Sequence, residues 1–150
     1  MKHTSCTALC VAGLLGLLGA NAAVADTSTT RAFLGMELTF GQAGSGTVSP
    51  DLYVGVAHGT ASPYGNVTGA KATVAWDFTT GITPSKVKLS GLAGRSYLQG
   101  ELGAGYSIAK GTPFFIGGLN GNHYAIGAEY YPNSGIGAYA GLQTLGNFKH

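Results

Sequence analysis

Residues 116–138 read IGGLNGNHYAIGAEYYPNSGIGA, in which an aliphatic residue is followed by Gly and then by Gly or Ala three times. The three copies begin at Ile116, Ile126 and Ile136, ten residues apart, and a related copy begins at Leu102. That spacing fits one strand plus one tight turn, and Asn120-Gly121 is a typical turn dipeptide. The repeat therefore predicts antiparallel hairpins.

The chain beyond residue 25 extends this pattern into an all-β fold. No window shows apolar residues at the three- and four-residue spacing of a helix, whereas Gly and β-favouring residues are frequent. Segments rich in Gly, Pro and Ser separate the expected strands. We predict eight strands, over Arg31–Gly41, Asp51–His58, Ala70–Phe78, Lys86–Ala93, Tyr97–Ser107, Pro113–Leu119, His123–Tyr131 and Gly135–Leu145.

The first 25 residues have the pattern of a secretory signal peptide. Lys2 and His3 precede an apolar run over residues 8–19, and two small-residue sites follow, ending at Ala22 and Ala25. An apolar run of about 12 residues is too short for a membrane anchor, which needs about 20. We expect residues 1–25 to be removed and residues 26–150 to form one β domain. Cleavage would also remove both cysteines, Cys6 and Cys10, and with them any disulfide or thiolate site.

The charge content limits the classes of function. Charged residues make up 9% of the chain, against roughly 25% in an ordinary soluble domain. Without Lys2, seven Lys and Arg stand against six Asp and Glu, so no strong positive field exists to attract nucleic acid. We expect no nucleic-acid partner, and a water-facing surface of ordinary solubility is hard to build from this composition.

Several predicted strands alternate between an aliphatic face and a small or polar face, as a two-residue period requires. In Arg31–Gly41 the even positions from Ala32 to Phe40 are apolar and the odd positions are small or polar, with Phe33 as the exception. The polar faces carry few charges, of both signs and in the middle of strands. A narrow barrel lumen would hold such charges as a paired network, with small neighbours leaving room for long side chains. The predicted lumen network is Arg31, Glu37, Lys71, Asp77, Lys88, Glu101 and Glu129.

Aromatic residues gather at or near the predicted strand ends. They fit the aromatic girdles of a membrane barrel, although ordinary core aromatics near turns remain an alternative. Tyr139 falls on the glycine face of the last strand, so either it fills the lumen or that strand is bulged. The predicted girdle residues are Phe40, Trp76, Phe78, Tyr106, Tyr130 and Tyr131.

Over Arg31–Phe148, these alternating Gly-rich strands, the signal peptide and an aromatic residue near the end resemble the small outer-membrane β-barrels of Gram-negative bacteria, the eight-stranded OmpA-like and OmpX-like class. The resemblance implies an antiparallel up-and-down β-barrel in the cell outer membrane. Lys149 and His150 follow Phe148, whereas such barrels usually finish on an aromatic residue. The predicted strands that begin at Asp51, Ala70, Lys86 and Pro113 are also short, and the loops do not alternate cleanly between short and long.

Motifs for catalysis or metal binding are lacking. The sequence contains no HxH or HExxH spacing and no GxSxG elbow. A lipid A deacylase-like site would need a His-x-Ser pair, and His123 is followed by Tyr124 and Ala125. A palmitoyltransferase-like site would recruit His58, Asp51 and Ser62. We expect no catalytic residue, no metal site and no cofactor.

The function expected from these observations is that of a non-enzymatic outer-membrane barrel with a side-chain-filled lumen and a structural or surface-interaction role. Its partners would be membrane lipid, lipopolysaccharide or a surface ligand, contacted through the loops Gln42–Pro50 and Gly59–Gly69 or through the turns opposite them. An eight-stranded barrel is too narrow for a wide solute channel. Two alternatives stay open: a soluble periplasmic β-sandwich or barrel that acts as a binding or inhibitor module with the aliphatic faces as its core, and a lipid A-modifying barrel enzyme.

Overall fold

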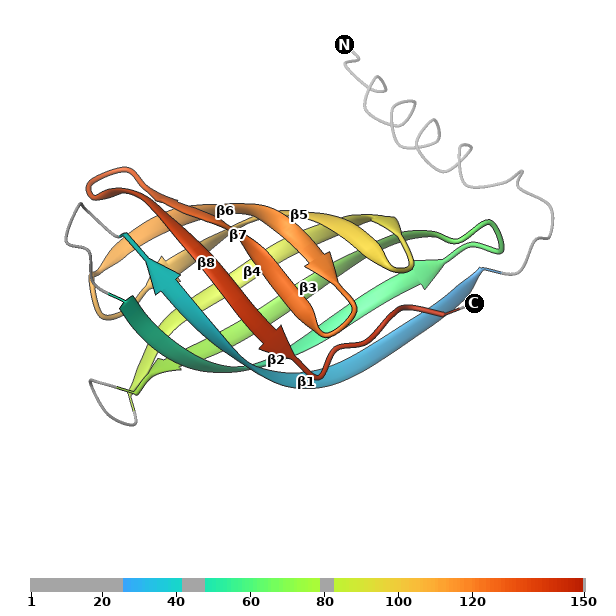
Figure 1. Ribbon diagram of the computed structural model, residues 1–150, viewed down its shortest axis with the longest axis horizontal. Helices are drawn as coiled ribbons and strands as arrows, with labels where there is room; N and C mark the ends of the chain where they lie inside the picture. Colours follow the sequence, from blue (N-terminus) through green and yellow to red (C-terminus); the bar gives the residue numbers. More distant parts are fainter. Residues whose placement is uncertain (1–25, 42–47, 79–82, 150) are drawn as a thin grey trace, which may run out of the picture.

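In the computed structural model, which describes residues 26–41, 48–78 and 83–149, eight antiparallel strands form a closed barrel (Figure 1). Each strand pairs with the next along the chain, and β8 closes the ring against β1. The eight predicted strands and the up-and-down topology are confirmed, whereas the predicted signal peptide lies outside the described residues. The strands are β1 Thr27–Phe40, β2 Val48–Ala61, β3 Asn66–Asp77, β4 Pro84–Arg95, β5 Leu98–Ser107, β6 Thr112–Gly121, β7 Tyr124–Tyr131 and β8 Gly135–Gln143.

The strands shorten around the ring, from 14 residues in β1 and β2 to 8 in β7 and 9 in β8. The prediction of short strands at Asp51, Ala70, Lys86 and Pro113 is wrong, because β2, β3, β4 and β6 contain 14, 12, 12 and 10 residues. A tilted membrane-spanning strand needs about 9 to 11 residues. These four strands therefore reach that length.

Connection lengths alternate along the chain, and each connection at one end of the barrel is shorter than its neighbours in sequence at the other end. The tight turns 62–65, 96–97 and 122–123 share one end with the start of β1, here called the turn end. The connections 41–47, 78–83, 108–111 and 132–134 share the other end, here called the loop end. The sequence-based view that loop lengths do not alternate is therefore wrong. The predicted loop Gly59–Gly69 is mostly strand, with its turn 62–65 at the turn end, whereas most of the predicted loop Gln42–Pro50 lies outside the described residues.

The aliphatic faces point outward and the charged faces point into the lumen. Leu102 and Leu142 are 77% and 72% exposed, whereas Glu129 is fully buried. Every second residue of β1 from Ala32 to Phe40 is exposed, and the residues between them are buried. The outward aliphatic side chains of these strands thus line no core, whereas other apolar residues, such as Val67 and Leu92, are buried inside.

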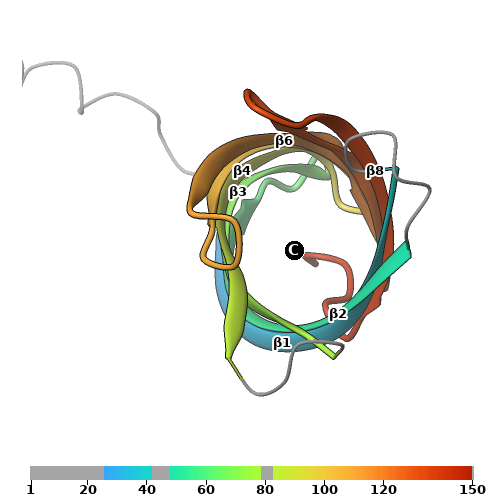
Figure 2. The same cartoon turned by 90° about the vertical axis from the view of Figure 1, so that its left-hand side faces the viewer.

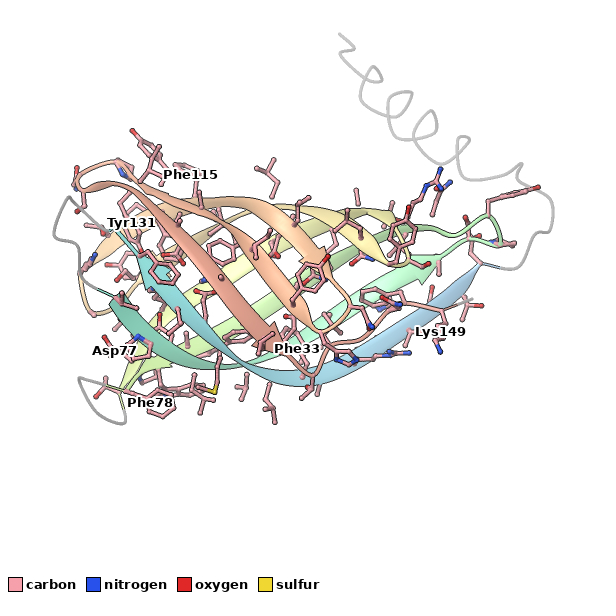
Figure 3. The ribbon with its side chains drawn as sticks, viewed as in Figure 1. Phe33, Asp77, Phe78, Phe115, Tyr131 and Lys149 are labelled. Atoms are coloured by element: carbon pink, nitrogen blue, oxygen red, sulfur yellow. The ribbon has the colours of Figure 1, made fainter. Side chains whose placement is uncertain are left out.

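Exposed aromatic residues lie near both ends of the outer wall. Phe40, Phe78, Tyr106 and Tyr130 are exposed at the loop end, as predicted, and Trp76 is partly exposed there. Phe115 joins them, and Figure 3 shows Phe78 and Phe115 on the outer side of the wall. The assignment of Tyr131 to this girdle is wrong, because its side chain is buried in the lumen. Three further exposed tyrosines, Tyr64, Tyr97 and Tyr124, lie at the turn end.

Candidate functional site

The lumen is the candidate site, because it gathers the buried charged and polar side chains. Lys88 Nζ lies 2.6 Å from Glu37 Oε1 and 2.7 Å from Glu129 Oε1. Lys86, two residues earlier in β4 and therefore on the same face, lies 3.0 Å from Asp51 Oδ2 and 3.3 Å from Glu129 Oε2. Glu129 thus bridges two lysines that reach it from the opposite side of the ring.

A second ion pair lies closer to the turn end. Lys71 Nζ lies 2.7 Å from Glu101 Oε2, and Ser90 donates a hydrogen bond of 2.7 Å to Glu101 Oε1. Lys71 and Glu101 are both buried. Buried charges of this kind are tolerated only when they are paired and hydrogen-bonded.

Five of the seven predicted lumen residues take part in these pairs: Glu37, Lys71, Lys88, Glu101 and Glu129. The other two lie elsewhere. Arg31, near the turn end, donates to the backbone oxygen of Asn147 at 3.2 Å, and Asp77, at the loop end, accepts a hydrogen bond of 3.2 Å from Ser49.

Sequence reasoning missed two members of the network, Lys86 and Asp51. The signal was present, because the two-residue period places Lys86 on the same face as Lys88 and Asp51 on the same face as the buried Tyr53. Both residues lie close to predicted strand starts, where the assignment of faces is least certain.

Buried amide side chains connect the charged layer to the turn end. Gln143 donates to Asn120 at 2.7 Å, and Asn120 donates to Gln99 at 3.0 Å. Tyr53 adds a hydrogen bond of 3.3 Å to Gln143. Buried amides need such partners, because an unpaired polar group in the lumen would lose its bonds to water without replacement.

Aromatic rings occupy the space that the lumen glycines leave. Tyr139 fills the lumen, and a Cβ on Gly118 or Gly127 would lie 2.7 Å from its hydroxyl oxygen. The register between β7 and β8 is continuous, so β8 is not bulged. A Cβ on Gly55 would likewise lie 2.6 Å from the Phe33 ring. These three glycines make room for rings, whereas a Cβ on Gly141 would lie 3.4 Å from the Glu37 side chain.

Beyond β8, the chain turns into the barrel at the turn end. Residues Thr144–Lys149, here called the inserted segment, enter the ring of strands (Figure 2). Leu145 and Phe148 are both 1% exposed. The residues around them form what we call the apolar chamber, lined by Phe33, Tyr53, Ala57, Ala61, Val67 and Leu92.

Few polar contacts hold the inserted segment. The Thr144 amide donates to the Leu34 carbonyl at 2.8 Å, and the Leu34 amide donates to the Thr144 hydroxyl at 3.1 Å. The His123 amide donates to the Leu145 carbonyl at 3.1 Å. His123 is the non-glycine residue with positive φ, 67°, among the described residues.

The polarity of the wall inverts at the turn end. There the lumen is apolar, while the outer face carries hydrogen-bonded polar side chains: Ser28 to Thr60 at 2.9 Å and Thr30 to His58 at 2.8 Å. This end of the barrel is therefore organised like a water-soluble protein, with an apolar inside and a polar outside.

A small lumen cavity lies between Tyr53, Lys71, Glu101 and Tyr139. It measures about 10 Å³, which is room for about one water molecule. At the loop end, Phe114 and Tyr131 stack with ring centroids 4.8 Å apart. Lys110 lies 4.8 Å above the Tyr131 ring, and burial, followed by repulsion from Lys86, lowers the pKa of its ammonium group.

The residues considered for lipid chemistry do not come together. His58 faces outward and contacts Thr30, Asp51 pairs with Lys86 in the lumen, and Ser62 lies in the turn 62–65. Within residues 26–41, 48–78 and 83–149, no group of three or more His, Cys, Asp or Glu side chains could hold a metal ion. In the same part of the chain, no helix has the length and apolar character needed to cross a membrane.

No protein-family description matches the chain, and comparisons with curated proteins and with solved structures give no match either.

Proposed function

We propose that the chain is an integral outer-membrane β-barrel protein whose filled lumen makes it an anchor or scaffold. One observation carries the proposal: the wall exposes aliphatic and aromatic side chains, while the lysines and glutamates in the middle of the strands are buried and paired inside. In lipid this arrangement is favourable, because apolar surface contacts the acyl chains and the ring, closed by β8 against Gly35–Phe40, pairs most of the backbone in the band.

The height of the apolar band supports this placement. On β1 the outward apolar residues run from Ala32 to Phe40. Eight residue steps correspond to about 27 Å along a strand, or about 20 Å along the barrel axis at a tilt of about 40°. The apolar band of outer-membrane barrels is about 25 Å tall. The exposed aromatic residues at the loop end, and Tyr124 at the other edge of the band, would then lie at the two membrane surfaces, whereas Tyr64 and Tyr97 lie in turns beyond the polar outer face.

The connections give the proposed orientation. Outer-membrane barrels have short turns on the periplasmic side and longer loops on the outside, so the turn end would face the periplasm. Partners would include membrane lipid around the apolar band and lipopolysaccharide or a surface ligand at the loop end. Lys110 and the connections 41–47 and 78–83 are at that end.

The other functions considered have less support. The filled lumen disfavours a channel, and the separation of His58, Asp51 and Ser62 disfavours a lipid A-modifying enzyme. If the chain nevertheless modified lipid A, cells that produce His58→Ala would have a changed lipid A profile compared with cells that produce the unsubstituted protein.

Cell fractionation tests the proposal. The full chain, produced in a Gram-negative host, should be found in the detergent-soluble outer-membrane fraction. It should also migrate differently on a gel before and after boiling, because a folded barrel resists detergent. Recovery of folded protein from the soluble periplasmic fraction would contradict membrane insertion.

A further inference from the structure

The seam between β1 and β8 covers less than half of β1. β8 pairs with Gly35–Phe40 through residues Ala138–Gln143, whereas the whole of β1 pairs with β2. The part of β1 from Thr27 to Leu34 therefore has a strand neighbour on one side only. On its other side runs the inserted segment (Figure 1).

The inserted segment leaves the β8 ladder at Thr144. The register of the seam, continued by one residue, pairs Leu34 with Thr144, and the bond from the Thr144 amide to the Leu34 carbonyl is the one that this pairing requires. The return bond is different, because the Leu34 amide donates to the Thr144 hydroxyl and not to its carbonyl. The side chain of Thr144 thus substitutes for one backbone bond where the chain turns inward.

A second contact matches the same register. Continued further, the register pairs Arg31 with Asn147, and Arg31 Nη1 already contacts the Asn147 carbonyl at 3.2 Å. In this register Leu145 and Asn147 would face the lumen, while Gly146 and Phe148 would face outward, in line with Ala140 and Leu142. The segment therefore keeps the alternation of a barrel strand, with an aromatic residue at the edge of the apolar band.

We propose that the inserted segment exchanges between two positions. In the chamber position, Phe148 packs in the lumen against Gly59. In the strand position, residues Thr144–Lys149 extend β8 along Thr29–Leu34, and Phe148 lies on the outer wall opposite Thr30. The exchange lengthens the seam and opens the apolar chamber at the turn end. The exchange of the inserted segment goes beyond the proposed anchor function, because it is argued from the register between β1 and β8 and not from the membrane location.

A pair of cysteines tests the strand position. On a full-length background with Cys6→Ala and Cys10→Ala, Ala32→Cys and Gly146→Cys would be directly opposite in the continued register. Their Cα atoms would be about 5.5 Å apart, within disulfide range. In the chamber position a Cβ on Gly146 would lie 3.4 Å from the His123 ring, at the β6–β7 turn. This pair leaves Phe148 unchanged. Thr68→Cys with Gly146→Cys is the matched control, because Thr68 shares the outer face but lies on β3, two strands away.

Under a mild oxidant, we expect the Ala32/Gly146 cysteine pair to lose both free thiols while the control pair keeps them. Gly59→Ala should speed this loss, because its Cβ would lie 2.7 Å from the Phe148 ring and would disfavour the chamber position. Gly117→Ala is its matched control, since the nearest atom there is 3.9 Å away, and it should leave the rate unchanged. If Gly59→Ala prevents folding, Phe148→Ala takes its place.

Two results would overturn the exchange. One is that the Ala32/Gly146 thiols stay free in a barrel that still shows heat-modifiable migration. The other is a rate of disulfide formation that neither Gly59→Ala nor Phe148→Ala raises. Fractionation decides the membrane location separately, so failure of one proposal does not imply failure of the other.

Discussion

Pairing is what makes the charged residues of this lumen compatible with burial. Lys88 contacts both Glu37 and Glu129, and Glu129 also accepts a hydrogen bond of 2.9 Å from Tyr131. A buried ion pair adds little net stability over apolar residues of the same volume, but removing one partner leaves a buried charge without compensation. Single substitutions in the network should therefore be far more harmful than substitutions of the whole pair.

Lys88→Met should lower the free energy of unfolding by about 3 to 5 kcal/mol. The double variant with Glu37→Gln should lose less than the sum of the two single variants, because each single change breaks the same pair. Urea unfolding in detergent or vesicles, followed by the fluorescence of Trp76, measures both. Arg95→Met, exposed at the turn end, is the control and should change stability by less than about 0.5 kcal/mol. Equal effects of Lys88→Met and Arg95→Met would contradict a paired lumen.

The two-residue period was sufficient to place Glu37, Lys71, Lys88, Glu101 and Glu129 in the sequence analysis. Tyr131 was assigned wrongly because its place at the end of a strand was given more weight than the alternation of inward and outward residues. Tyr130 faces outward, so its immediate neighbour must face inward. The pairing partners themselves could not be predicted, because the ion pairs reach across the lumen between strands that are not hydrogen-bonded neighbours.

At the scale of strands, the apolar band is the part of the outer wall whose surroundings, lipid or water, have to be tested. Ile126 lies on the outer face of β7 between Tyr124 and Tyr130, and all three side chains are exposed. Thr68 lies on the outer face of β3 near the turn end, beyond the apolar band and next to the polar side chains of β2. The same substitution at these two sites therefore compares lipid with water.

Ile126→Arg should destabilise the barrel in vesicles by about 2 to 4 kcal/mol if the side chain lies near the middle of the bilayer. Thr68→Arg should change stability by less than about 0.5 kcal/mol. Equilibrium unfolding of both variants in the same vesicles gives the comparison. Similar stability of the two variants would place both sites in water and argue against the proposed membrane band.

The strands themselves were easier to predict than their ends. The period of two is clear wherever the outer face is aliphatic, as in residues 31–41. It disappears over Thr27–Thr30 and Gly59–Gly69, where the outer face is polar and the inner face is small, so these strand ends resembled loops in composition. The extension at the turn end could not be predicted, because the inserted segment that covers its inner face comes from residues about 80 to 120 positions away in the chain.

For the whole molecule, a filled lumen means a barrel that does not conduct. The stacked rings of Phe114 and Tyr131, the ion pairs and the apolar chamber follow one another from the loop end to the turn end. Liposomes that contain the protein should therefore not swell in solutions of small sugars, whereas liposomes with a porin should. Swelling at a rate above that of protein-free liposomes would contradict the closed lumen.

The short seam has a consequence for the order of folding. Seven of the eight strand pairings join consecutive strands, whereas the seam joins Gly35 to Gln143 and contains six residue pairs. Chain-entropy costs rise with the separation of the residues that meet. We expect the hairpins to form first and ring closure to be the slow step. A substitution in the seam should therefore delay the appearance of the folded, heat-modifiable band on an unboiled gel more than a substitution between β2 and β3.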